Sequence, residues 1–165
     1  GLQAIATARR LGAVVQAYDV RPAVKEQIES LGAEFIELDI DSGDSEDAGG
    51  YATAQEEAFY RRQREELAKV AAANDVVITT AAIPGQEAPL LITTEAVRGM
   101  ESGSVIVDLA AERGGNCEAT VPDQTVEVSR VTIIGYTDLT SRLATHASQF
   151  FGNNLAHLLE VCPAG

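Results

Sequence analysis

The chain has 165 residues, 45% of them hydrophobic, and a formal net charge of −13 at pH 7. This length is sufficient for one globular domain with a buried core. The acidity disfavours nucleic acid and anionic membrane surfaces as partners, because like charges repel. No apolar run approaches the roughly 20 residues that span a bilayer, which argues against direct membrane insertion.

The cysteines and histidines indicate no site of their own. Cys117 and Cys162 are far apart and belong to no C-x-x-C motif, so neither a disulfide framework nor a zinc site is predicted, and a reducing cytoplasm fits best. His146 and His157 fall on one predicted helix, three turns apart, which is too distant to chelate one metal ion. We therefore expect no metal site.

The first nineteen residues have the pattern of half a dinucleotide-binding unit. A helical segment ends at the turn residue Gly12, an apolar strand is predicted over 13–18, and Asp19 follows the strand. In such units a strand enters a G-x-G-x-x-G turn, and the following helix directs its N-terminal N–H groups at the cofactor pyrophosphate. Gly1 takes the place of the last of these glycines, so the first strand and the first two glycines are expected to be missing from the chain.

Asp19 and Arg21 bear on which dinucleotide is bound. An acidic residue roughly 20 positions after the glycines accepts hydrogen bonds from the adenosine ribose, and Asp19 stands at this position, which favours NAD. Arg21 instead favours NADP, because an Arg beside the strand end can pair with the 2′-phosphate of NADP. An ordinary helix and strand that end at a surface Asp would have the same pattern.

The remaining elements alternate along the chain. Further strands are predicted over 34–38, 76–79, 104–109 and 131–135, and helices over 22–31, 54–73, 94–100 and 145–161. Short, nearly continuous apolar strands that alternate with helices are typical of a parallel sheet buried on both faces. The predicted fold is therefore α/β, a Rossmann-like doubly wound parallel sheet that lacks its first strand in this chain.

Residues 39–50 fit no regular element and are predicted to be a loop rich in Asp and small residues. A long loop in a nucleotide-binding fold is often a lid. Tyr51 directly follows Gly49 and Gly50, and an aromatic residue on a glycine hinge is able to cover a flat ring. A solvated surface loop is the alternative.

Two segments follow predicted strands where such folds bind ligands. Residues 79–85, T-T-A-A-I-P-G, form a small-residue turn that a cofactor can approach closely. Asp108 ends the next strand, and we expect it to cap a turn rather than to act in catalysis. No hydrolase motif is present, and no catalytic side chain is predicted, because hydride transfer from a nicotinamide requires mainly positioning and exclusion of water.

Taken together, these segments resemble the NAD(H)-binding domain of the proton-translocating NAD(P) transhydrogenase alpha subunit, in the alanine dehydrogenase/transhydrogenase family. The motifs that carry the resemblance are G-L-Q-A-I-A-T-A-R-R-L-G-A-V-V at 1–15, D-V-R-P-A-V-K-E-Q at 19–27, G-G-Y-A at 49–52, T-T-A-A-I-P-G at 79–85, G-S-V-I-V-D-L-A at 103–110, G-G-N-C-E at 114–118 and I-G-Y-T-D-L at 134–139.

The resemblance implies direct hydride transfer between NADH bound by this chain and NADP+ bound by a partner domain. The partners that it implies are the NADP(H)-binding domain and the membrane domain of the same enzyme, with proton translocation in the latter. It also implies a homodimer and a peripheral location at the cytoplasmic face of the bacterial inner membrane. Residues 1–165 are then a partial NAD(H)-binding domain, in which helix 144–161 leads back toward an absent N-terminal domain.

Site residues follow from the same resemblance. Asp19, Val20 and Arg21 match the segment that contacts the ribose, and Gly50 and Tyr51 match a mobile loop that closes on the nucleotide. The remaining expected cofactor contacts, beside Gly1, are Gln63 and Ala82.

The chain departs from the family pattern at two positions. Ala82 stands where Leu is usual, which predicts a weaker apolar contact, and Thr140 stands where Pro is common, which removes a rigid residue from that loop. Two other functions remain open. One is an alanine dehydrogenase-like amino-acid dehydrogenase, and the other is a non-catalytic module that binds NADH and signals to a partner.

Overall fold

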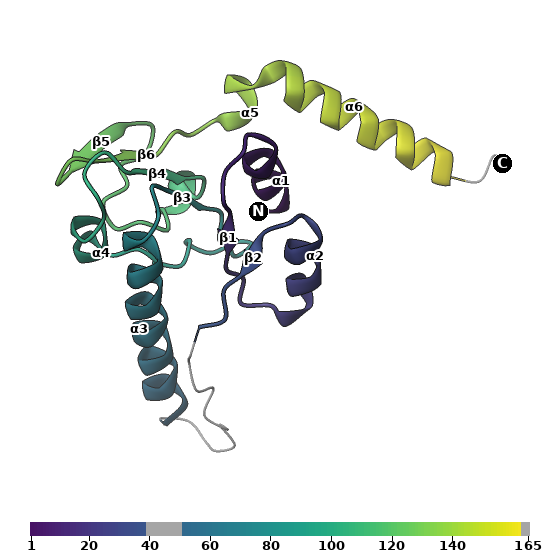
Figure 1. The fold of residues 1–165 in the computed structure, drawn as a ribbon. Helices are drawn as coiled ribbons and strands as arrows, with labels where there is room; N and C mark the ends of the chain where they lie inside the picture. The colour runs from purple at the N-terminus through teal and green to yellow at the C-terminus, as the bar shows by residue number, and fades with distance from the viewer. Residues whose placement is uncertain (39–50, 163–165) are drawn as a thin grey trace.

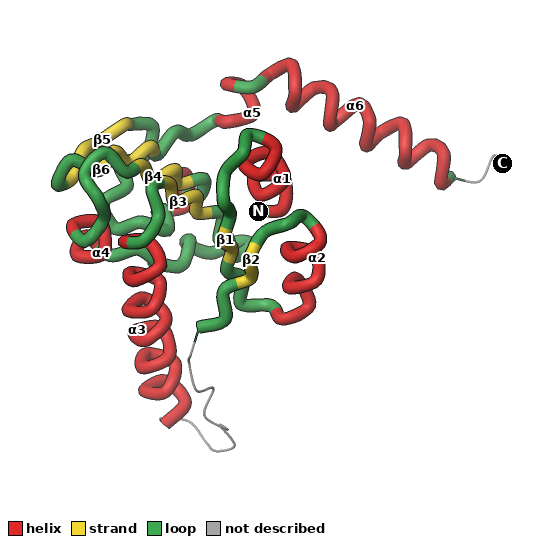
Figure 2. The backbone as a smooth tube through the Cα atoms, viewed as in Figure 1, coloured by secondary structure: helices red, strands yellow, loops and turns green. Residues whose placement is uncertain are grey.

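The computed structural model describes residues 1–38 and 51–162, with side chains from Glu57 onward in the second segment, and the chain alternates between helices and strands (Figure 1, Figure 2). The helices are α1 (Leu2–Arg10), α2 (Lys25–Ser30), α3 (Tyr51–Ala72), α4 (Thr94–Arg98), α5 (Leu139–Arg142) and α6 (Ala144–Val161), with 3-10 turns η1 (Pro22–Val24) and η2 (Ala111–Arg113). The strands are β1 (Gln16–Ala17), β2 (Glu34–Phe35), β3 (Val76–Thr79), β4 (Val105–Asp108), β5 (Thr125–Val128) and β6 (Val131–Ile134).

The main sheet has the strand order β3-β4-β6-β5. β3, β4 and β6 are parallel, as predicted, but β5 pairs antiparallel with β6. The two strands are joined by Ser129 and Arg130, both with positive φ (53° and 65°), which gives the tight turn that matches strand twist. Strand β5 was not among the predicted strands, because Ser-Arg is not a recognisable hairpin turn sequence.

A second, two-stranded parallel sheet pairs β1 with β2. Both strands are two residues long, shorter than the predicted 13–18 and 34–38. A side-chain hydrogen bond connects β1 to the segment that precedes β3, from Asn74 Nδ2 to Gln16 Oε1 at 3.2 Å. Among the described residues, no strand pairing joins this sheet to the main sheet.

The larger core lies on one face of the main sheet. Val77, Ile106 and Ile133 are aligned in register across β3, β4 and β6, in one cluster with Leu67 of α3 and Val97 of α4. A smaller core joins α1 and α2 to the β1–β2 sheet, with Ile5, Ile28 and Ala33 at its centre.

The opposite face of β3 is open, which differs from the prediction of a sheet buried on both faces. The exposed fractions of Val76 and Ile78 are 56% and 43%. Apolar sequence indicates that a face is suited to burial, but it does not show that another part of the same chain covers it.

Helix positions agree with the predictions within a few residues. Thr93 caps α4, because its side-chain oxygen accepts a hydrogen bond from the Ala96 N–H at 3.2 Å. α3 begins at Tyr51, three residues before the predicted start at residue 54. The predicted loop over 39–50, including Gly50, lies outside the described residues.

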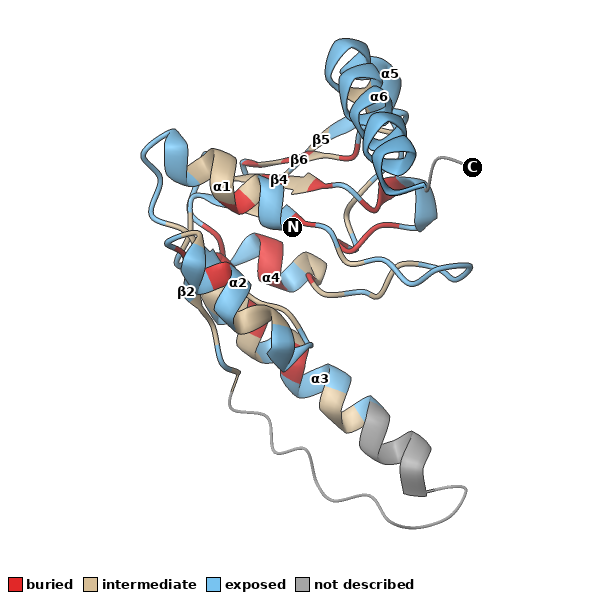
Figure 3. Ribbon diagram, turned by 90° about the vertical axis from the view of Figure 1, so that its right-hand side faces the viewer, coloured by how far each residue is buried: buried red, intermediate tan, exposed pale blue. Residues whose placement is uncertain are grey.

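The C-terminal helix α6 extends away from the two sheets, and its side chains are exposed along most of its length (Figure 3). In the preceding helix α5, the guanidinium of Arg142 stacks 4.3 Å from the centre of the Tyr136 ring and pairs with Asp123 at 2.5 Å. Thr140, where Pro is usual, is exposed within α5. Within the described ranges, no helix is both long and apolar enough to cross a membrane.

The described core predicts that truncating two isoleucines will have very different effects on the free energy of unfolding. Ile106→Ala should reduce the free energy of unfolding by about 2–5 kcal/mol, because Ile106 is fully buried and its truncation leaves a cavity. Ile83→Ala, in an exposed turn, should cost far less. Denaturant unfolding of both variants tests this, and equal losses would contradict the described core.

Candidate functional site

The candidate site lies at the carboxyl edge of the strands. β3 and β4 run parallel and are in register from Val76–Val105 to Thr79–Asp108, so the turn at 79–85 and the segment after Asp108 leave the sheet at the same edge. In open α/β sheets this edge is where ligands bind.

The N-terminus of α1 lies beside this turn. A Cβ atom built on Gly1 would lie 3.7 Å from Thr80 Oγ1, and α1 has no side-chain N-cap. The structure therefore brings Gly1 together with the 79–85 turn, in which Ala82 is exposed. A helix N-terminus with uncapped N–H groups favours an anionic ligand.

Asp19 and Arg21, directly after β1, form an ion pair. Arg21 Nε donates to Asp19 Oδ1 and Arg21 Nη2 to Oδ2, both at 2.9 Å, and the Arg21 N–H donates to Oδ1 at the same distance. The hydrogen bonds from Arg21 lower the pKa of the Asp19 carboxyl group. Val20 between them is exposed. Among the described residues, no hydrogen bond joins this segment to the 79–85 turn.

Gln63 lies in the interior, with an exposed fraction of 2%. Its Nε2 donates to the Tyr18 hydroxyl at 2.9 Å, which ties α3 to the end of β1, next to Asp19. Tyr18 and Asp19 also line an open hollow of about 400 Å³ with Phe35 and Phe59. Gln63 thus contacts the hollow only through Tyr18, which lines it. Its expected contact with a cofactor stays a prediction.

Asp108 is the most highly connected polar side chain at this edge, and its exposed fraction is 1%. Its carboxyl oxygens accept five hydrogen bonds, from the hydroxyl groups of Thr79 and Thr120 and from the backbone N–H groups of Ala110, Asn116 and Cys117. The turn-capping interpretation is confirmed at Ala110, and the other four bonds join Asp108 to residues 8 to 29 positions away in the sequence. Hydrogen bonds of this kind offset the free-energy cost of burying a carboxyl group away from water.

Sequence reasoning missed Asn116. This residue is fully buried, and its side-chain amide hydrogen-bonds the backbone N–H and C=O of Ala81. The sequence signal was present in G-G-N-C-E, since two glycines before a polar residue often mark a close backbone approach. Its partner, however, lies 35 residues away and is visible only in the fold.

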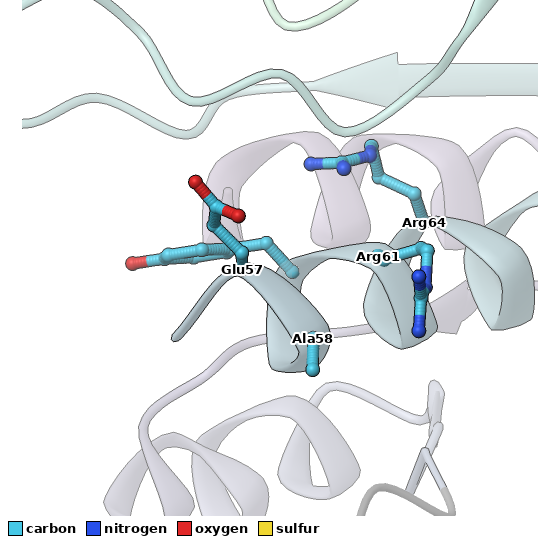
Figure 4. A pocket seen from close by; sticks show the side chains of 5 residues that line it. Glu57, Ala58, Arg61 and Arg64 are labelled. Carbon is cyan, nitrogen blue, oxygen red and sulfur yellow. The ribbon is translucent and has the colours of Figure 1, made fainter. Parts of the chain in front are cut away.

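A larger hollow, of about 530 Å³, lies on α3 alone (Figure 4). Its charged lining residues are Glu57, Arg61 and Arg64, and Arg61 Nε lies 4.0 Å from Oε1 of Glu65, which is outside the lining. A surface built from one helix does not bring groups from different elements together on a ligand, so the carboxyl edge remains the candidate site.

The chemistry available at the edge is that of binding. Tyr51 begins α3 and Gly50 is outside the described residues, so their expected role as a lid stays a prediction. Across the described part of the chain, no group of three or more His, Cys, Asp or Glu side chains is arranged to hold a metal ion.

The strand order and the parallel register define a Rossmann-like α/β domain, whose candidate site lies at the carboxyl ends of its strands. The family model described as "Alanine dehydrogenase/PNT, C-terminal domain" matches residues 1–164, and the chain belongs to this family.

Several relatives are similar over nearly the whole chain. The NAD(P) transhydrogenase subunit alpha of Haemophilus influenzae is 53% identical over 163 residues, covering 98% of this chain and 31% of the relative. The corresponding protein of Cereibacter sphaeroides is 51% identical over 161 residues, covering 96% and 31%. The crystal structure of transhydrogenase from Sinorhizobium meliloti matches with a TM-score of 0.75 and 46% identity, over 97% of this chain and 40% of that chain.

The similarity to alanine dehydrogenase is lower. Alanine dehydrogenase 1 of Staphylococcus aureus is 33% identical over 106 residues, which cover 61% of this chain and 28% of the relative. The chain spans about a third of the length of these relatives, so it corresponds to one part of them.

The lowered pKa of Asp19 predicts a pH-dependent contribution to stability. Arg21 favours the ionised carboxylate, so the pair should stabilise the fold above the ordinary pKa of 3.8, and this contribution should disappear as the pH falls through the lowered pKa. Wild type and Asp19→Asn are compared by thermal unfolding from about pH 7 to about pH 3. The difference should be small, because Arg21 is exposed, and should shrink toward acid; a difference that is independent of pH would contradict the assignment.

Proposed function

We propose that this chain is the NAD(H)-binding part of a proton-translocating NAD(P) transhydrogenase. The observation that carries the proposal is the identity of about half the residues, over nearly the whole chain, with subunits of that name. The uncapped α1 N-terminus next to a small-residue turn supports it, because this geometry suits the pyrophosphate of a dinucleotide.

Each of these residues then has its own role in binding the cofactor. Gly1 admits the pyrophosphate to the N-terminus of α1, and Asp19 accepts hydrogen bonds from the adenosine ribose. Val20 contributes apolar contact, and Arg21 orients Asp19 through their ion pair. Ala82 lies against the cofactor from the 79–85 turn.

Three further residues complete the proposed site. Gln63 supports the Asp19 segment through Tyr18. Tyr51, the first residue of α3, and the preceding Gly50 close over the nucleotide.

Hydride transfer in this arrangement needs no acid or base from the chain. Bound NADH supplies the hydride, which passes to NADP+ on a partner domain. The chain binds one nucleotide, orients it at the carboxyl edge and limits the access of water. A site made of backbone, small side chains and one ion pair is suited to binding of this kind, without an acid or base.

The partners of the domain follow from the same proposal. They are an NADP(H)-binding domain, a membrane domain that moves protons, and a second copy of the subunit, with the chain at the cytoplasmic face of the inner membrane. α6 leads back to an N-terminal domain of the same subunit. The exposed apolar side chains of Phe151, Leu155 and Leu158 recur at helical spacing, and this suits a helix that packs against another domain.

The first experiment is a paired titration of the complete subunit with NADH and NADPH, followed by nucleotide fluorescence. Wild type should bind NADH more tightly than NADPH. Asp19→Ala should weaken NADH by about 10- to 100-fold, because a charge-assisted hydrogen bond is worth about 1.5–3 kcal/mol. The same change releases Arg21, so NADPH affinity should rise rather than fall.

Asp123→Ala is a matched control, because Asp123 also pairs with an arginine, Arg142, but precedes the hairpin β5–β6. This variant should leave both affinities unchanged. Equal binding of NADH and NADPH by wild type, or unchanged affinity in Asp19→Ala, would contradict the proposal. Oxidation of alanine by the wild-type subunit, without transfer to an NADP analogue, would favour the alanine dehydrogenase alternative, to which the family model also extends.

The proposed lid makes a separate prediction. Tyr51→Ala should slow hydride transfer to NADP+ more than it weakens NADH binding, because a lid acts on the closed complex. Single-turnover rates and equilibrium titrations on the same preparation give the two quantities. Equal losses in rate and affinity would indicate a simple contact residue.

A further inference from the structure

The side chain of Asn116 joins both ends of the turn that follows β3. Its Oδ1 accepts from the Ala81 N–H at 3.0 Å, and its Nδ2 donates to the Ala81 C=O at 3.0 Å and to the Pro89 C=O at 2.8 Å. Three hydrogen bonds from one fully buried amide fix the backbone of the turn at the sheet and again beyond its tip.

Asn116 is itself held in place by Asp108. The Asn116 N–H donates to Asp108 Oδ2 at 2.8 Å, and this contact requires the preceding backbone to pass very close to the carboxyl group. Gly115 makes this possible, because its φ is +83° and a Cβ there would lie 2.8 Å from Asp108 Oδ2. The rigid end of β4 therefore determines where the Asn116 amide points.

The turn has one bound side and one free side. Ala81 is tied to Asn116, whereas Ala82 and Ile83 are exposed and Thr80 adjoins Gly1 of α1. The exposed residues are thus presented next to a helix N-terminus by a backbone that is already ordered.

We infer that Asn116 is a positioning residue for the nucleotide, which fixes the 79–85 turn in its binding shape before the nucleotide arrives. The inference rests on the proposed function and adds to it a residue that contacts only the chain. The physical reason is preorganisation: a turn that is ordered in advance does not lose backbone freedom when the ligand binds, so affinity is higher.

The test uses Asn116→Ala in the complete subunit. Loss of the three hydrogen bonds should raise the Kd for NADH about tenfold, the change expected when one or two net hydrogen-bond contributions are lost. Asn74→Ala is the matched control, because Asn74 also donates two side-chain hydrogen bonds, to Gln16 and to the Val70 C=O, but lies before β3, away from the carboxyl edge. It should lower the unfolding temperature and leave the Kd within about twofold.

A purely structural role would give a different result. The two variants would then lower the unfolding temperature and change NADH affinity in the same proportion. That outcome, or an unchanged Kd in Asn116→Ala, would overturn the inference.

Amide hydrogen exchange of the wild-type subunit provides a second measurement that does not depend on a variant that folds. The Ala81 N–H should exchange slowly before NADH is added, because its acceptor is a buried side chain. Fast exchange that becomes slow only with NADH would show that the nucleotide, and not Asn116, orders the turn. Failure of the wild type to bind NADH would instead reject the proposed function, so the two failures are distinguishable.

Discussion

The buried carboxyl group of Asp108 is the interaction on which the candidate site depends. Its five hydrogen bonds join the end of β3, the turn after β4, the segment at 116–117 and Thr120. An unsatisfied carboxyl group in this interior position would cost several kcal/mol, so the surrounding segments are constrained to bring donors to it. The shape of the carboxyl edge is therefore largely a consequence of satisfying one side chain.

The ligand surface is built on this constraint and remains polar in a specific way. The N-terminus of α1 and the turn after β3 adjoin at Gly1 and Thr80, where backbone N–H groups and small side chains dominate. Asp19 and Arg21 neutralise one another in an ion pair. An acidic residue at this position is typical of NAD sites, and a basic residue is typical of sites for a 2′-phosphate. Under the proposed function, a dinucleotide that contacts Asp19 competes with the Asp19–Arg21 ion pair as well as with water.

Much of the remaining surface is suited to contact with other protein. The open face of β3 exposes Val76 and Ile78, and α6 exposes an apolar stripe along its length. The relatives named NAD(P) transhydrogenase subunit alpha are about three times as long as this chain, which agrees with a domain that packs against others. Under the proposed function, these faces meet the N-terminal domain and a second subunit.

The sequence by itself determined the fold class, the family and the order of most elements. Strand β3 was predicted with the bounds that the structure has, and α6 within one residue. Apolar runs and helical periodicity are patterns of neighbouring residues, so they are visible in the sequence itself. The position of Asp19 shortly after β1 was also predictable from spacing, although the strand ends at Ala17, one residue before the predicted end.

The tertiary structure alone decided the antiparallel strand β5, the one-sided burial of β3 and the links from Asp108 and Asn116 to the turn at 79–85. These features depend on pairs of residues that are distant in sequence: Asn116 and Ala81 are 35 residues apart, and Thr79 and Asp108 are 29 apart. Such pairs meet only after the parallel strands have brought their carboxyl ends to one edge, so no local pattern in the sequence reveals them.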